Sequence, residues 1–110
     1  MRKPIAFTGS SRKDLIAFPH SVRQQLGYQL DRVQQGMAPD DWKPLSAVGP
    51  GVLEIRVMAE EGIWRAVYVA KFAEAVYVLH CFQKKTQATS LLDIRLARQR
   101  YNALIQERKK

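Results

Sequence analysis

Three neighbouring segments decide the fold: Val52-Leu-Glu-Ile-Arg-Val-Met58, Ile63-Trp-Arg-Ala-Val-Tyr-Val-Ala70 and Ala75-Val-Tyr-Val-Leu-His-Cys-Phe-Gln83. Each is rich in the β-branched and aromatic residues that strands favour. Short breaks separate them, with Ala-Glu-Glu-Gly at 59–62 and Lys-Phe-Ala-Glu at 71–74. Consecutive strands joined by short turns pair antiparallel, so the sequence predicts a three-stranded meander.

The register of this meander depends on the length of its turns. If the first hairpin closes through an even number of loop residues, Arg56 lies opposite Arg65. An even second loop then puts Arg65 opposite His80 or Phe82. An odd loop without a compensating bulge would scatter these side chains, because a slip of one residue reverses the strand faces. Two-residue loops are the favoured hairpin connections, which favours the even alternative.

The even register gathers charged side chains on one face of the sheet, and the apolar alternates are expected to pack beneath helices. The charged members are Glu54, Arg56, Arg65, His80 and Lys84. Like charges directly opposite each other are destabilising unless an anion lies between them, so the two arginines indicate an anion site. Each residue also has a structural alternative: an ion pair for Arg56, a sheet hydrogen bond for His80, and solvation for Lys84 and Lys85.

The segments before the meander predict one strand and two helices. Ile5-Ala-Phe7 is a strand able to join the sheet. A capping pattern at Ser11 opens a helix that ends near Phe18, and a second helix runs from Pro19 to Gly36. Residues 37–51 lack periodicity and predict an ordered loop, held to the core by Trp42 and Leu45.

A last helix follows the meander, with Thr89 or Ser90 as its N-cap. Its apolar stripe contains Leu91, Ile94, Ala97, Tyr101, Leu104 and Ile105. The predicted order is therefore β-α-α-β-β-β-α in a single domain, residues 1–110. We expect an α+β fold, with an antiparallel sheet packed against helices on one face and the charged group on the other.

The charge balance indicates a polyanionic partner. Lys and Arg number 18 against 10 Asp and Glu, for a net charge of +8. Such a surplus speeds encounter with nucleic acid. The last helix is the most basic segment, and Arg95, Arg98 and Arg100 on it are candidates for nucleic-acid contact. A solvated helix face is the alternative.

Other site classes lack their sequence signatures. No apolar run approaches the ~20 residues that span a membrane, and the N-terminus does not read as a signal peptide. The single cysteine, Cys81, excludes an internal disulfide and fits a reducing cytoplasm, where we expect it to be a buried apolar residue. His20 and His80 lie far apart, and no phosphate loop or nucleophile elbow is present, so no metal or other cofactor is expected.

The remaining chemistry is cationic. Guanidinium groups bind phosphate through bidentate hydrogen bonds, and a lysine whose pKa is lowered by neighbouring cations can act as a base. Such a group can stabilise the pentavalent transition state of RNA cleavage. If the RNA supplies its own 2′-OH as nucleophile, no metal is required. The loss of Arg65 would then remove activity and leave the fold intact.

Several of these segments together resemble a known family. Leu53-Glu-Ile-Arg56, Gly62-Ile-Trp-Arg-Ala-Val-Tyr-Val-Ala70 and Val78-Leu-His-Cys-Phe-Gln-Lys-Lys-Thr-Gln87 are similar to the phage-derived HigB-type toxins of the RelE/ParE superfamily. The likeness continues through Asp93, Ala97 and Arg100 and covers nearly the whole chain.

The resemblance implies a toxin that cleaves mRNA on the translating ribosome and is neutralised by an antitoxin, usually a helix-turn-helix protein. By motif position, Arg56, Arg65, Lys84 and Lys85 would be catalytic. His80, which the even register places on the same face, is a further catalytic candidate. Two alternatives stay open: a ParE-like inhibitor of DNA gyrase, and a basic nucleic-acid-binding module without catalysis. The arginine and lysine group favours the nuclease over the gyrase inhibitor.

Overall fold

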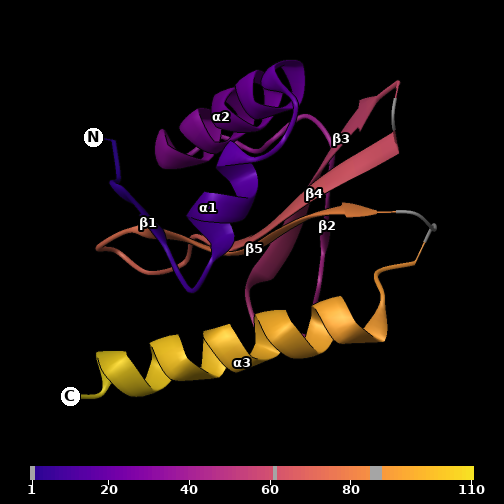
Figure 1. The fold of residues 1–110 in the computed structure, drawn as a ribbon. Helices are drawn as coiled ribbons and strands as arrows, with labels where there is room; N and C mark the ends of the chain where they lie inside the picture. Colours follow the sequence, from indigo (N-terminus) through magenta and orange to yellow (C-terminus); the bar gives the residue numbers. More distant parts are fainter. Residues whose placement is uncertain (1, 61, 85–87) are drawn as a thin grey trace.

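The computed structural model describes residues 2–60, 62–84 and 88–110. Its elements, in order, are β1 (Ile5–Phe7), α1 (Ser11–Ile16), α2 (His20–Gln34), β2 (Trp42–Pro44), β3 (Val52–Ala59), β4 (Gly62–Val69), β5 (Val76–Lys84) and α3 (Leu91–Arg108) (Figure 1). The α+β class and the predicted order are confirmed, with the short strand β2 added inside the segment predicted as a loop.

The five strands form one mixed sheet in the order β1-β5-β4-β3-β2. β1 pairs with β5 in parallel, so the prediction of an antiparallel sheet is wrong at this edge. Parallel neighbours require a long connection, and the chain between β1 and β5 supplies one that contains two helices and three strands.

The register of the meander is the predicted even one. Ala59 pairs with Gly62 across a two-residue connection, and Arg56 pairs with Arg65. Across the β4–β5 ladder, Arg65 pairs with Phe82, which is one of the two partners that the sequence allowed for it. The register shifts farther along the β4–β5 ladder, where the consecutive residues Val67 and Tyr68 pair with His80 and Val78 and the extra residue belongs to β5; this shift does not disturb the charged end.

The helices cover both faces of the sheet, so the prediction of helices on one face only is wrong. α1 and α2 lie on one side and α3 on the other (Figure 1). Beneath α3 is a second apolar cluster that includes Val52, Val67, Leu79 and Ala97. The face that carries the charges is thus apolar over much of its area, and a sheet that is apolar on both faces must be covered on both.

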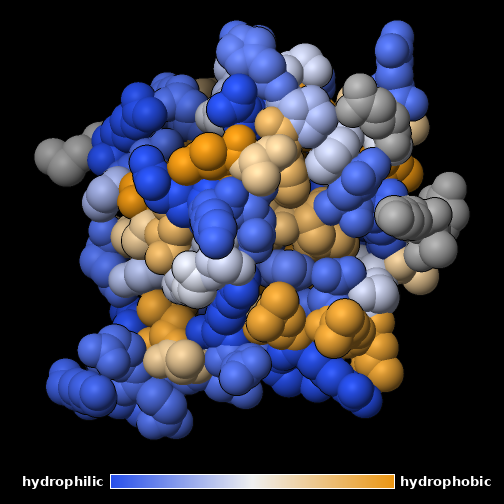
Figure 2. All heavy atoms as spheres, in the orientation of Figure 1, coloured by the Kyte–Doolittle hydropathy of each residue, from blue (hydrophilic) through white to orange (hydrophobic). Residues whose placement is uncertain are grey.

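Part of the predicted apolar stripe of α3 does not reach the sheet. Ala97, Tyr101 and Leu104 are buried, but Leu91 is 60% exposed, so its assignment to the core is wrong. Apolar side chains gather on the outer surface over the N-terminal half of α3 (Figure 2). Leu92, the residue after Leu91, is 76% exposed.

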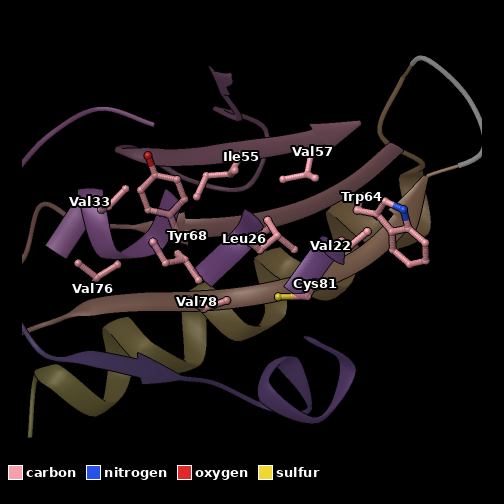
Figure 3. Packing of buried hydrophobic residues seen from close by; sticks show 12 residues of the cluster. Val22, Leu26, Val33, Ile55, Val57, Trp64, Tyr68, Val76, Val78 and Cys81 are labelled. Carbon is pink, nitrogen blue, oxygen red and sulfur yellow. The ribbon is translucent and has the colours of Figure 1, made fainter. Parts of the chain in front are cut away.

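The other face forms the larger core. α2 places Val22 and Leu26 on the sheet, where they meet Ile55, Trp64 and Tyr68 as predicted (Figure 3). Cys81 is also buried in this cluster, and burial raises the pKa of its thiol to about 12. A thiol in that state is a poor nucleophile, consistent with the predicted structural role.

Most element boundaries lie within a residue or two of those predicted. The N-cap of α1 is Ser10, while Ser11 is buried and donates a hydrogen bond to the Val78 carbonyl. Pro19 is the N-cap of α2 and precedes its first residue. Gly36 has a φ of 85°, the left-handed conformation expected of a helix stop. Ser90 is the N-cap of α3 and accepts a hydrogen bond from the Asp93 backbone.

The segment between α2 and β3 is only partly as predicted. Leu45 is buried, but Trp42 is 42% exposed at the sheet edge and does not anchor the segment. β2 pairs with β3, which places Lys43 opposite Glu54. No helix within the described ranges combines the length and apolar character needed to cross a membrane.

The core between α2 and the sheet sets a first prediction. Leu26→Ala removes a fully buried side chain and is expected to lower the free energy of unfolding by about 2–5 kcal/mol. Leu92→Ala, at an exposed position of α3, is the control and should change it by less than about 0.5 kcal/mol. Denaturant titrations of both variants measure the difference. Equal effects would contradict the observed packing.

Candidate functional site

The register brings the predicted charged group to one end of one sheet face. Arg56, Arg65 and Lys84 occupy neighbouring strands, and His80 pairs with Val67 farther along β4. The sequence located these residues correctly in the sheet. The structure differs from the expectation in their surroundings, because most of them are buried.

Arg65 is fully buried and forms an ion pair with the equally buried Glu54. Glu54 also lies 3.8 Å from the amino group of Lys43 and accepts a hydrogen bond of 2.9 Å from the Thr89 hydroxyl. The negative charge beside the opposed arginines is therefore a protein carboxylate two residues before Arg56. An external anion is not required to make this arrangement stable.

Lys84 is buried next to this ion pair. Its amino group donates a hydrogen bond of 3.1 Å to the Thr89 hydroxyl, so Thr89 bridges Lys84 and Glu54. Burial and, second to it, the nearby positive charge of Arg65 lower the pKa of Lys84 to about 8. A lysine in this state is partly neutral near pH 8 and can accept a proton.

Arg56 lies at the solvent-accessible rim of the group. Its guanidinium binds Asp41, with Nε and Nη2 at 3.0 and 2.7 Å from the same carboxylate oxygen. These two residues, with Met58 and Ile63, line a shallow depression of about 130 Å³. Because this ion pair is about one-third exposed, it is weaker than the buried pair at Glu54.

His80 joins the sheet to the first turn of α3. Its Nε2 lies 2.7 Å from Asp93, and its ring stacks on Phe82 with centroids 4.8 Å apart. Arg100, which can only donate, approaches the other ring nitrogen at 3.5 Å. This geometry fits an Nε2–H that donates to Asp93. His80 is buried and positions α3, as the structural alternative predicted.

The three arginines of α3 have different surroundings. Arg95 is exposed. Arg98 is also exposed, but its guanidinium donates to the Ala47 carbonyl at 2.6 and 2.9 Å. Arg100 is half-buried and donates to the Leu79 carbonyl and the Ser10 hydroxyl, both at 2.9 Å. Arg100 is therefore not on a solvated helix face, because α3 covers the charged face of the sheet and turns this side chain inward.

Sequence reasoning missed several members of the group. Lys43 and Asp41 lie in the segment that lacked periodicity, and only the pairing of β2 brings them to the site. Thr89 was considered only as a helix cap and Asp93 as part of the family resemblance, although their side chains contact Glu54 and His80. Lys85 lies outside the described residues. Among the residues that the structure describes, no three His, Cys, Asp or Glu side chains cluster in a way that could hold a metal.

The buried ion pair generates a second prediction. Arg65→Ala leaves the Glu54 carboxylate buried without its closest cation, which should lower the free energy of unfolding by about 3–5 kcal/mol. The fold would then not remain unaffected, contrary to the expectation from sequence. Arg56→Ala removes a partly exposed pair and should cost about 1 kcal/mol or less.

Urea unfolding of both variants tests this difference. The double variant Glu54→Leu/Arg65→Met removes both buried charges and should recover most of the loss. If Arg65→Ala were as stable as Arg56→Ala, the pair would not be buried in solution.

Comparisons with known proteins agree with this fold. The family model described as "Phage derived protein Gp49-like (DUF891)" matches residues 13–102. The structure of E. coli toxin RelE, a double arginine-to-alanine mutant in the free state, is similar at a TM-score of 0.64 and 16% identity, with 94% of this chain and 99% of that chain covered.

A second similar structure is a chain of the toxin–antitoxin complex RelBE2 from Mycobacterium tuberculosis, at a TM-score of 0.54 and 17% identity. The match covers 76% of this chain and 100% of that chain. No curated protein matches the sequence. At these identities the two solved structures establish a shared fold.

Proposed function

Because the chain belongs to the family of phage-derived Gp49-like proteins, we propose that it is the toxin of a toxin–antitoxin pair and that it cleaves RNA. The similarity of its fold to that of the RelE toxin supports this assignment. More specifically, we propose a HigB-type endoribonuclease that acts in the cytoplasm on mRNA at the ribosome, with a cognate antitoxin, of the helix-turn-helix type, as its inhibitor.

One observation carries the proposal of catalysis. The amino group of Lys84, with a pKa lowered to about 8, lies in a cationic network with Arg65 and Lys43. In the proposed reaction Lys84 removes the proton from the RNA 2′-OH, which attacks the adjacent phosphorus. The 5′-oxygen of the next nucleotide leaves and takes up a proton, and the product is a 2′,3′-cyclic phosphate. No metal ion is needed for these steps.

The other predicted residues take supporting roles in this proposal. Arg65 keeps the pKa of Lys84 low and adds positive charge near the reacting phosphate. Arg56 contacts phosphate at the rim, and Lys85, which lies outside the described residues, is proposed as a further phosphate contact. Arg95 and Arg98 are docking charges for RNA or ribosome, whereas His80 and Arg100 position α3.

Substrate access is the demanding part of this proposal. Lys84 is only 6% exposed and is covered in part by Thr89, in the segment that leads into α3. RNA binding must therefore displace this segment from the sheet. The same burial favours a second candidate function, a basic nucleic-acid-binding protein without catalysis. In that case the buried charges of Arg65 and Lys84 would serve the fold, through their contacts with Glu54 and Thr89, and would not act on a substrate.

The pH dependence of cleavage tests the role of Lys84. A general base must be neutral to act, so the single-turnover rate on ribosome-bound mRNA should rise with pH and level off above about 8. Lys84→Arg keeps the positive charge but cannot give it up, and should lower the rate by about 10²–10⁴-fold. Lys13→Arg, at an exposed position, is the control and should retain the wild-type rate.

A flat pH profile in the wild type would exclude Lys84 as the base. RNA binding without any cleavage would favour the second candidate. Growth arrest without RNA cleavage, accompanied by gyrase inhibition, would instead support the ParE-like alternative.

The chemistry of the ends gives a separate prediction. If the 2′-OH is the nucleophile, the 5′ fragment ends in a 2′,3′-cyclic phosphate or its 3′-phosphate hydrolysis product. Enzymatic end-labelling before and after phosphatase treatment distinguishes these ends. Cleavage of mRNA should also persist in excess EDTA, with a separate control in which magnesium keeps the ribosome intact. Fragments with a free 3′-hydroxyl would indicate attack by water and contradict the mechanism.

A further inference from the structure

A groove on the opposite side of α3 from Arg98 belongs to no part of the proposed catalytic site. It lies between α3 and the turn that connects β1 to α1, and its volume is about 560 Å³. Thr8 and Gly9 form one wall, and Leu96, Gln99, Ala103 and Glu107 form the other, with Arg100 and Leu104 at the base. The Arg100 guanidinium spans the base because it binds both Leu79 and Ser10.

The α3 wall of the groove is a helical stripe distinct from the one that packs on the sheet. Positions 92, 96, 99, 103 and 107 are spaced by three or four residues and therefore share one side of the helix. Leu92 is 76% exposed and lies one helical turn before Leu96 on this stripe. From Leu96 to Glu107 the wall is about 16 Å long, enough for about three turns of a packed helix.

The shape and chemistry of the groove favour a protein helix as its occupant. Its walls are a helix and a turn, so it offers no open strand edge for a peptide to extend. The apolar side chains that line the groove, such as Leu96 and Ala103, can pack against the apolar face of an amphipathic helix. RNA would require exposed cations in the groove itself, whereas the Arg100 guanidinium is bonded to protein acceptors.

Charge decides which helix fits. The chain carries a net charge of +8, so a second copy of the chain would be repelled. Arg12 and Lys13 are exposed just beyond the turn wall, and Lys109 is exposed beyond the end of the α3 wall. Two acids lie nearby: Asp14, which accepts a hydrogen bond from the neutral Ser10 hydroxyl, and Glu107, which pairs with Lys110, so basic side chains outnumber acidic ones around the groove. An acidic segment complements this surface.

We propose that the groove between α3 and the β1–α1 turn binds an acidic amphipathic helix of the cognate antitoxin. The inference rests on the proposed function, which supplies the partner. The helix lays its apolar side chains against Leu96 and Ala103 and points its carboxylates toward the basic rim.

The test uses the purified protein encoded by the reading frame adjacent to this gene, with binding measured by titration calorimetry. Ala103→Glu places a bulky negative charge on the groove wall and should weaken binding at least tenfold. Gln99→Glu adds the charge with almost no change in size and should weaken it to a smaller extent. Asn102→Glu, exposed on the outer side of the same helix, is the matched control and should stay within twofold of wild type.

All three variants should show the thermal stability and growth arrest of the wild type when produced without the adjacent protein. Equal affinities for Ala103→Glu and Asn102→Glu, or no binding of the adjacent protein to the wild type, would overturn the proposal. So would a loss of RNA binding by Ala103→Glu with protein binding intact. Binding that depends on Ala103, in a wild-type chain that causes no growth arrest, would support the groove and contradict the toxin function.

Discussion

The structure depends on one buried ion pair, between Glu54 on β3 and Arg65 on β4. Charges with no access to water are tolerated only when their partners are close and their remaining hydrogen-bonding groups are used. Glu54 meets this condition with groups from three other places, since Lys43 comes from β2, Arg65 from β4 and Thr89 from the start of α3. A slip of one residue would turn Arg65 into the apolar core under α2, so the pair also specifies the register.

The same network controls the lysine proposed as the base. Thr89 binds Glu54 with its hydrogen and Lys84 with its oxygen, which connects the ion pair to the amino group. A second link between His80 and Asp93 holds the first turn of α3 over the sheet. The burial that lowers the pKa of Lys84 therefore also limits its exposure to a substrate. Reactivity and access are opposed in this part of the molecule.

The sequence predicted the arrangement of the sheet better than the partners of its charged residues. The preference for a two-residue hairpin loop, together with the alternation of side chains between the two sheet faces, was sufficient to place Arg56 opposite Arg65. The position of α3 was missed because Val52, Val67 and Leu79, at the far end of the charged face, were not read as a second core. Asp41 and Lys43 could not be placed, because three-residue strands have no detectable period and their pairing is decided by tertiary packing.

The parallel pairing of β1 has a consequence for the order of folding. Ile5 lies beside Val76, so this contact closes a loop that contains most of the chain. Closing so long a loop early is entropically unfavourable, whereas the β3–β4 hairpin closes over two residues. During synthesis β1 leaves the ribosome before β5 and must wait for this partner strand until the two helices and three strands between them have been made. The first strand to be synthesised is therefore among the last to be paired, and the N-terminal region completes the sheet only after the hairpins have formed.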